Sequence, residues 1–280
     1  MGSTATHRHR ILMCAPDYFS VDYVINPWMA GNEGQLDLAL AERQWRSLHD
    51  AIADVADIEL MQPKPDLPDL VFTANAGFVF GNKVVPSHFM PMERRPEEPY
   101  IKQWFADHNY DLHVLPENIG FEGAGDCLID RSGSWLWTGY GFRTEIEAHA
   151  YLADWFDYDI VSIRLTDSRF YHIDTCLCPL SDGYLLYHPD AFDADSNKAI
   201  EDRVAADKRI PVAPDDAANF SCNAVNINEH IFCHGFSAGL GTELTARGFV
   251  LHEVALSEFL KAGGSAKCLT LRLTEPEISS

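Results

Sequence analysis

The chain has 280 residues, 46% of them hydrophobic and 11% aromatic, which is enough to bury a core and excludes a disordered polypeptide. Its formal net charge of −21 argues against nucleic acid or an anionic membrane as a partner. A cationic small substrate would suit that charge, although a solvated acidic surface is the simpler explanation. No signal peptide opens the sequence, no apolar run approaches the ~20 residues that cross a bilayer, and the seven cysteines lack paired extracellular spacing. We therefore expect free thiols in a reducing cytoplasm.

The predicted elements follow one another in a regular order from the first strand. We expect residues 1–10 to be disordered and residues 11–275 to form a single α/β domain. A strand opens at Ile11 (ILMC), an amphipathic helix follows over residues 33–57, and a second strand (IELM) comes next. The Pro- and Asp-rich stretch at 63–69 is typical of a loop before the first hairpin, not of a domain boundary.

A unit of about 49 residues then recurs along the chain. Four similar stretches start 49, 49 and 50 residues apart, at Phe72, Phe121, Phe170 and Phe220, and a fifth surrounds Cys268. Each of the four contains an apolar strand, a short Gly/Asn/Asp/Ser turn and a second strand. Further helices are predicted over residues 99–108, 144–157, 195–206 and 243–247, and short strands begin at 58, 112, 159 and 249. Such a period indicates one supersecondary unit that is repeated in a ring or a solenoid.

A ring is favoured over a solenoid by the two ends of the pattern. The first strand lacks a preceding partner and the last strand (CLTLRL) lacks a following one, so pairing them removes both open edges. We therefore predict five ββαβ units, with pseudo-fivefold repeats, closed around an axis. The first strands of these units would bring together Asn75, Glu122, Asp126, His172, Asp174 and Cys268.

Cys268 and His172 are the minimal pair for covalent chemistry. Cys268 follows GGSAK, whose exposed amides and lysine could lower the pKa of a thiol. His172 lies two residues before Asp174, so on a strand both side chains point to the same side. A zinc site that combines His172 with Cys176 and Cys178 is disfavoured, because Cys-x-Cys without a second pair is a poor tetrahedral set.

The spacing of two further acids can be interpreted in the same way. Glu122 and Asp126 are an even number of residues apart and would share one face of a strand. Two carboxylates near an imidazole would fix its tautomer and could bind a cationic group. The segment EGAGD is also Gly-rich, so solvated loop acids are the alternative interpretation.

At these residues the sequence resembles the guanidine-modifying superfamily, or penteins, which includes arginine deiminases, dimethylarginine dimethylaminohydrolases, amidinotransferases and arginine dihydrolases. The resemblance covers essentially the whole chain, through INPWM from Ile25, PDLVFTAN from Pro68, FEG from Phe121, HID from His172 and the terminal Cys268. These motifs are specific in combination, although each is weak alone. The resemblance implies a five-bladed ββαβ propeller that uses no cofactor and no metal.

The resemblance also assigns roles to individual residues. Cys268 corresponds to the family nucleophile, His172 to the general acid/base and Glu122 to the acid that orients the histidine. Asp174 matches the guanidinium-binding acid of deiminases and amidinotransferases. Asn75 stands where deiminases have an aspartate, which is similar to arginine dihydrolases. The remaining positions that look like substrate contacts of that subfamily are Asn26, Asp126, Arg94 and Arg143.

The two arginines are natural partners for a substrate α-carboxylate, although Arg94 lies in the charged run MERRPEE and could instead be solvated. The implied reaction converts arginine to ornithine, ammonia and carbon dioxide through a covalent thiouronium adduct. The alternatives are a deiminase that forms citrulline, a dimethylarginine dimethylaminohydrolase and an amidinotransferase. A further alternative is a catalytically silent propeller that acts as a binding protein. The expected ligand is arginine or a methylated arginine, and a homo-oligomer is left open.

Overall fold

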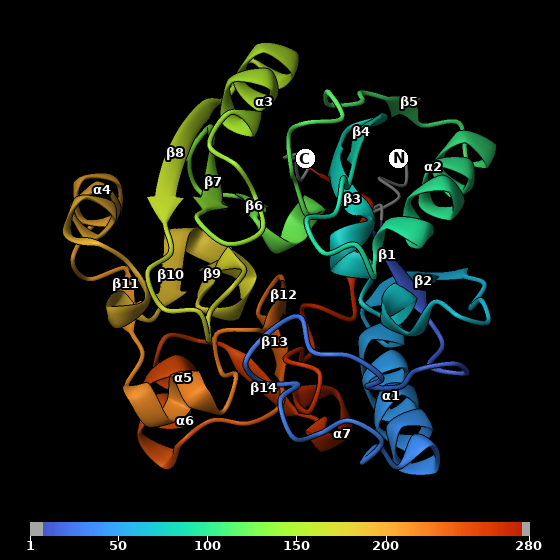
Figure 1. Cartoon of the computed structure of the whole chain (residues 1–280). Helices are drawn as coiled ribbons and strands as arrows, with labels where there is room; N and C mark the ends of the chain where they lie inside the picture. Colours follow the sequence, from blue (N-terminus) through green and yellow to red (C-terminus); the bar gives the residue numbers. More distant parts are fainter. Residues whose placement is uncertain (1–7, 276–280) are drawn as a thin grey trace, which may run out of the picture.

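Five small sheets surround a central axis in the computed structural model, which describes residues 8–275 (Figure 1). In each sheet two antiparallel strands form a pair, and a third strand runs parallel to the middle strand. Four sheets consist of consecutive strands: β3 (Gly77–Phe80), β4 (Lys83–Pro86) and β5 (Asp111–Leu112); β6 (Cys127–Ile129), β7 (Trp135–Tyr140) and β8 (Asp159–Arg164); β9 (Leu177–Leu180), β10 (Tyr184–Tyr187) and β11 (Arg209–Pro211); β12 (Val225–Ile227), β13 (His230–Cys233) and β14 (Val250–Glu253). This arrangement confirms the predicted α/β propeller with five blades.

The fifth sheet joins the two ends of the described chain. It consists, in order, of β15 (Leu271–Arg272), β1 (His9–Cys14) and β2 (Ala56–Met61). Because β15 runs antiparallel to β1, the first and last strands close the ring as the sequence predicted. The first strand begins at His9, ahead of the expected boundary, because His9 and Arg10 already pair with β2. The rest of the segment predicted to be disordered, residues 1–7, lies outside the described residues.

In each blade a helix connects the middle strand to the outer strand and lies at the periphery of the ring (Figure 1). These helices are α1 (Leu38–Ala53), α2 (Glu98–Asp107), α3 (Ala148–Phe156), α4 (Ala194–Arg203) and α6 (Ala238–Ala246). The side chains of Asp37, Asp193 and Ser237 accept backbone N–H groups at the starts of α1, α4 and α6. The helix predicted over 243–247 begins earlier, at this serine cap. The strand β11 and the short helices α5 (Pro214–Ala218) and α7 (Ser257–Leu260) were not predicted.

Apolar side chains from neighbouring blades share a common core. Phe78 of β3, for example, packs edge-on against Phe156 of α3, with ring centroids 5.4 Å apart. Leu152 of α3 is fully buried in the same cluster. Burying each such side chain contributes about 1.5–3 kcal/mol, so the core holds the blades in fixed positions relative to the axis.

The polar residues expected on the first strands lie instead in turns that precede those strands. Thr73–Ala76, Gly123–Gly125 and Ile173–Thr175 each form a 3-10 turn, and β3, β6 and β9 follow them. The prediction that these groups point inward from a regular strand is therefore wrong. Gly123 has a φ of 61°, and a Cβ at this position would lie 2.8 Å from the backbone of Gly77. The turns of adjacent blades thus approach one another at backbone contact distance near the axis.

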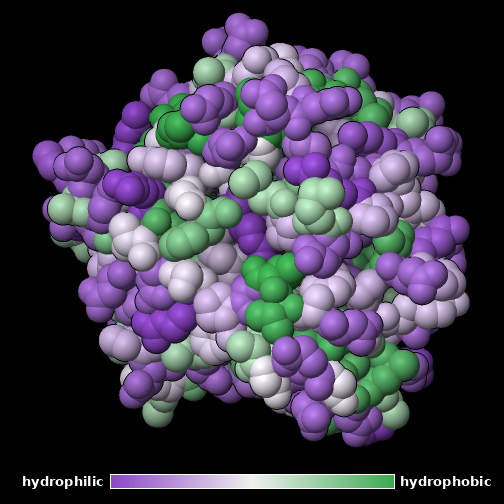
Figure 2. All heavy atoms as spheres, viewed as in Figure 1, coloured by the Kyte–Doolittle hydropathy of each residue, from purple (hydrophilic) through white to green (hydrophobic). Residues whose placement is uncertain are grey.

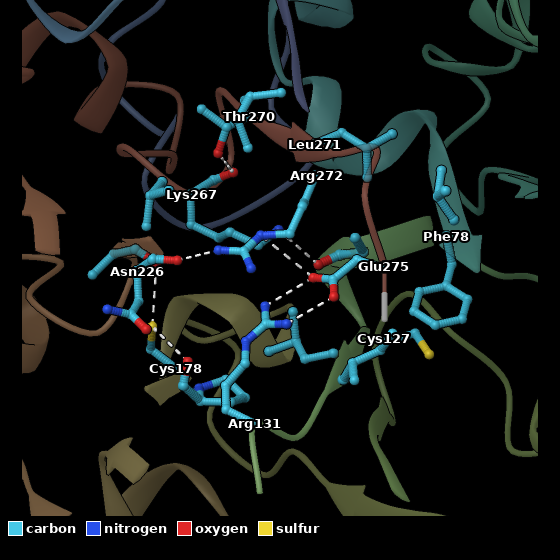
Figure 3. A pocket seen from close by; sticks show the side chains of 18 of the residues that line it. Phe78, Cys127, Arg131, Cys178, Asn226, Lys267, Thr270, Leu271, Arg272 and Glu275 are labelled. Atoms are coloured by element: carbon cyan, nitrogen blue, oxygen red, sulfur yellow. Dashed lines mark hydrogen bonds and ion pairs between the residues drawn. The ribbon is translucent and has the colours of Figure 1, made fainter. Parts of the chain in front are cut away.

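A cavity of about 60 Å³ also lies at the axis, between the inner strands (Figure 3). Glu275, at the end of the described chain, directs its carboxylate into this region. Arg131 donates to its two oxygens at 2.8 Å each, and Arg272 lies 3.5 Å from one of them. These contacts tie the last strand to the blade that contains β6. Lys267, the residue before Cys268, borders the same cavity.

On the face shown in Figure 1 the segment between β1 and α1 extends in front of the blade formed by β12, β13 and β14. Trp28 donates from its indole nitrogen to the Arg169 carbonyl oxygen at 2.7 Å, and Arg143 donates to the Ile25 carbonyl oxygen at 2.8 Å. Apolar and hydrophilic side chains are interspersed on this face (Figure 2). This covering segment is therefore docked on loops of two other blades. Within residues 8–275, no helix has the length and apolar character needed to cross a membrane.

Candidate active site

Cys268 lies in the last turn before β15 and is buried, with 2% of its surface exposed. Its sulfur is 3.7 and 3.8 Å from the two carboxylate oxygens of Asp174. Burial, with Asp174 adding to it, raises the pKa of the Cys268 thiol. Burial also raises the pKa of Asp174 to about 7, against the opposing effect of the Lys267 ammonium 3.8 Å away. A thiol with a raised pKa stays protonated at neutral pH.

His172 directs one ring nitrogen to a carboxylate and leaves the other without a partner. Its Nε2 lies 2.7 Å from Glu122 Oε2, and its buried Nδ1 makes no hydrogen bond. Because a carboxylate can only accept, the proton is assigned to Nε2 and Nδ1 is the basic nitrogen. Burial lowers the pKa of His172 to about 4, although Glu122 opposes this effect. A neutral imidazole with one free nitrogen can take up and return a proton during turnover.

Glu122 is the anion of the site. Its Oε2 also accepts from Arg143 Nη1 at 2.9 Å, and its Oε1 accepts from the Met90 N–H at 3.2 Å. Burial alone would raise the pKa of Glu122, but Arg143 and His172 together lower it to about 2. The carboxylate therefore stays ionised and holds the imidazole in one orientation.

Asn75 contacts the backbone of Glu122, and Arg94 contacts Asn75. Asn75 donates to the Glu122 carbonyl oxygen at 3.1 Å and accepts from Arg94 Nη1 at 2.9 Å. Arg94 is buried and forms a two-pronged ion pair with Glu97, with both N···O distances at 2.8 Å. The alternative that Arg94 is a solvated surface charge is therefore wrong. Its short sequence separation from Glu97 lets one turn preorganise the guanidinium.

The other predicted contact residues differ in where their polar atoms point. Asn26 accepts from the Trp28 N–H at 2.9 Å and donates to the Ala262 carbonyl oxygen at 3.0 Å, so it joins the covering segment to the nucleophile side of the ring. Asp126 is buried, and its Oδ1 accepts from the Ile173 N–H at 3.0 Å. Burial raises the pKa of Asp126. Asp126 thus supports the turn that carries the histidine, and its contact with substrate stays a prediction.

A small cavity of about 10 Å³ remains beside these groups under the covering segment. The residues that line it are Ile25, Asn26, Met29, Asp69, Phe72, Asn75, Arg94, Arg143, Tyr171, Ala262 and Cys268. The cavity therefore combines a thiol, two cationic side chains, two amides and one carboxylate.

Asp69 is a cavity residue that the sequence analysis missed. Its Oδ2 accepts from the Tyr23 hydroxyl at 2.7 Å, while its buried Oδ1 makes no hydrogen bond. Burial raises the pKa of this carboxyl, although the nearby Arg94 opposes the shift. The residue lies in the Pro- and Asp-rich stretch that was interpreted as a loop. Its spacing of six residues from Asn75, within one motif, was the available signal.

Metal chemistry has no obvious ligand set in the part of the chain that the structure describes. No three His, Cys, Asp or Glu side chains within residues 8–275 are grouped so that they could hold an ion. Cys176 and Cys178 are buried among apolar residues, and all seven cysteines are free. The chemistry available to the site is that of a thiol, an imidazole and carboxylates.

A five-bladed ββαβ propeller with Cys, His and Glu at its axis defines the class of guanidine-modifying enzymes. The sequence model of the family described as "N,N dimethylarginine dimethylhydrolase, eukaryotic" matches residues 28–275. The chain belongs to this family, within the pentein superfamily.

Several relatives resemble the chain over nearly its whole length. The bifunctional arginine dihydrolase/ornithine cyclodeaminase ArgZ of Synechocystis sp. is 55% identical over 95% of this chain and 38% of its own length. The N(G),N(G)-dimethylarginine dimethylaminohydrolase of Mycobacterium tuberculosis is 36% identical over 94% of this chain and 85% of its own length. The chain thus spans well under half of the bifunctional relative.

Solved structures match equally well. The crystal structure of the N-terminal domain of ArgZ, in a cysteine-to-serine variant bound to substrate, has a TM-score of 0.95 and 54% identity. It covers 96% of this chain and 100% of that domain. The Pseudomonas aeruginosa dimethylarginine dimethylaminohydrolase, at 20% identity and a TM-score of 0.81, supports the fold alone.

Proposed function

We propose that the chain is a cysteine-dependent arginine dihydrolase, which converts arginine and two water molecules to ornithine, two ammonia molecules and carbon dioxide. The observation that carries the proposal is the amide of Asn75 in the wall of the cavity that contains Cys268. This amide both donates and accepts, through contacts to the Glu122 carbonyl oxygen and to Arg94. A neutral amide tolerates an uncharged ureido group, which a carboxylate would disfavour. The resemblance to ArgZ over 95% of the chain supports the same assignment.

The proposed reaction begins when the cationic guanidinium enters beside Asp174 and Cys268. Its charge favours ionisation of both groups, so the thiolate forms and attacks the central guanidinium carbon. In this scheme the proton released by the thiol passes to Nδ1 of His172. His172 returns it to the departing nitrogen, so that the first ammonia leaves and a thiouronium adduct remains. His172 then removes a proton from water, which adds to the same carbon.

Loss of the second nitrogen distinguishes a dihydrolase from a deiminase. If the carbon–sulfur bond breaks after the first addition of water, the product is citrulline. If the second amino group leaves as ammonia instead, an S-carbamoyl cysteine remains. A second water molecule hydrolyses this intermediate, and the released carbamate decomposes to ornithine and carbon dioxide. In the proposal, Arg94 and Arg143 hold the substrate α-carboxylate, while Asn26 and Asp126 complete the substrate-binding set.

Incubation of the purified protein with L-arginine tests this proposal. We expect ornithine and about two ammonia per arginine, with no turnover by Cys268→Ser. Citrulline with one ammonia would assign a deiminase instead and contradict the role given to Asn75. For the Asn75→Asp variant we expect citrulline to replace part of the ornithine.

Hydrolysis of dimethylarginine is the second candidate, because the matching family model carries that description and the Mycobacterium tuberculosis relative is 36% identical. Turnover of dimethylarginine at a higher kcat/KM than arginine would favour it. We further propose a reducing cytoplasmic location, which the seven free cysteines support. A homo-oligomer stays open until the mass in solution is measured.

A further inference from the structure

Asn223 lies in the turn before β12, in the one blade for which the proposed reaction uses no residue. It is the third residue after Phe220, just as Asn75 is the third residue after Phe72, so the two amides have equivalent places in the repeat. Asn223 is completely buried. Its amide donates to the Asp174 carbonyl oxygen at 2.9 Å, which parallels the contact of Asn75 with the neighbouring turn.

The side-chain oxygen of Asn223, Oδ1, accepts hydrogen bonds from three backbone N–H groups of the nucleophile loop, the segment that ends at Cys268. It accepts from Ser265 at 3.1 Å, from Lys267 at 3.1 Å and from Cys268 at 3.2 Å. The loop follows two glycines, whose backbone is conformationally free, and these three bonds help to fix its path. Because all three N–H groups must point at one oxygen, these hydrogen bonds restrict the conformation of the loop.

The amide nitrogen of Asn223 reaches the reacting atom itself, because Nδ2 lies 3.1 Å from Cys268 Sγ. This N–H opposes the effect of burial and of Asp174, both of which raise the pKa of the thiol. A hydrogen bond to a charged acceptor is stronger than one to a neutral acceptor, so the contact favours the thiolate over the thiol. It also helps the sulfur to leave when the covalent intermediate breaks down.

We propose that Asn223 is the positioning residue of the nucleophile: its oxygen fixes the Cys268 loop and its N–H stabilises the Cys268 thiolate. This inference rests on the proposed function only in taking Cys268 as the nucleophile. It assigns to the fourth repeat a role in the chemistry, next to the residues supplied by the other four repeats.

The Asn223→Asp variant tests the proposal, because it keeps an oxygen for the three backbone donors and replaces the N–H donor by a charged acceptor. The readout is the pH dependence of alkylation by 2-chloroacetamide, followed by mass spectrometry on the peptide that contains Cys268. We expect the apparent pKa of this thiol to rise by about one unit or more. With arginine, kcat should fall more than KM changes.

The matched control is Asn226→Asp, three residues further along the same blade. Asn226 is also a buried amide, but its N–H groups donate to the carbonyl oxygens of Asn228 and His230 and do not touch the nucleophile loop. We expect the apparent pKa of the Cys268 thiol to be unchanged in this control. If Asn223→Asp fails to fold, Asn223→Ser, which keeps a small neutral hydroxyl, should show a smaller shift in the same direction.

An unchanged alkylation profile in a folded Asn223 variant would overturn the proposal, and so would equal shifts in both variants. Alkylation by a neutral reagent requires no arginine turnover. Failure of the proposed dihydrolase activity and failure of this inference are therefore measured separately.

Discussion

Asp174 is a carboxylate that the fold holds in an environment unfavourable for its charge. Its side chain is completely buried, 3.7 Å from a thiol, and the Lys267 ammonium is 3.8 Å away. Replacing it by Asn keeps the shape and removes the charge. We predict that Asp174→Asn abolishes turnover of arginine and at the same time stabilises the fold at alkaline pH.

The magnitude follows from the pKa of Asp174, which burial raises from an ordinary value of 3.8 to about 7. A raised folded-state pKa means that the contribution to stability is complete below the unfolded pKa and is lost as the pH rises through the folded pKa. A shift of about 3 units at about 1.4 kcal/mol each corresponds to about 4 kcal/mol lost above pH 7. At about pH 5.5 roughly half of that loss has occurred, so the difference between variant and wild type should grow by about 2 kcal/mol up to about pH 8.5.

Urea unfolding at these two pH values is the assay. We take an m value, the slope of the free energy of unfolding against urea concentration, near 3 kcal/mol per molar. A change of about 2 kcal/mol in the stability difference then moves the urea midpoint of the variant, relative to wild type, by about 0.7 M. As a control, Asp216→Asn removes a buried carboxylate that accepts from the N–H and hydroxyl of Ser237 at 2.7 Å each, and should only destabilise. A stability difference for Asp174→Asn that is the same at both pH values would refute the reasoning.

Two further substitutions probe the same centre. Glu122→Gln should lower kcat by about a hundredfold or more, because His172 loses its anionic partner. It should also reduce the free energy of unfolding at neutral pH by about 3 kcal/mol, because the pKa of Glu122 lies at about 2, below its ordinary value of 4.5. In urea unfolding at stepped pH, that loss should disappear as the pH falls from about 4.5 towards about 2, and a constant difference would contradict this origin. Gly125→Ala places a Cβ 2.4 Å from Asn75 Nδ2 and 3.2 Å from the His172 ring, so we expect about 1–3 kcal/mol of destabilisation and a lower kcat. Its control is Gly239→Ala in α6, where the nearest atom is 3.9 Å away and thermal unfolding should change little.

The ring could be predicted from the sequence because the pattern of strands and helices is periodic. Hairpins repeat at fixed intervals, and the unpaired first and last strands could satisfy each other only by closing a circle. The same periodicity placed Glu122, His172 and Cys268 in corresponding positions, and the structure brings them to one axis. The short 3-10 turns were missed because three or four residues are too few for periodicity to distinguish a turn from the start of a strand.

Residues whose partners are distant in sequence could not be recognised in the same way. Asn223 contacts the loop of Cys268, which lies 45 residues further along the chain. Its place after Phe220 matches that of Asn75 after Phe72, but this place does not indicate the partner. Burial can be hidden even where partners are near: Arg94 lies in a charged run typical of a surface, yet it is an interior residue that contacts Glu97 and Asn75. Burial and long-range hydrogen bonds are properties of the folded chain and are not encoded in local composition.

Closure of the ring and placement of the nucleophile depend on neighbouring contacts, because Cys268 and β15 are close in the sequence. Thr73 donates from its hydroxyl to the carbonyl oxygens of Leu12 and Leu269, at 2.9 and 3.0 Å, and so joins the beginning of the ring to its end. The Ala74 N–H donates to the carbonyl oxygen of Cys268 itself at 3.1 Å. A chain whose fifth blade has not formed lacks these contacts to Cys268 and its neighbours. Under the proposed function, arginine turnover should therefore return during refolding no earlier than this blade forms.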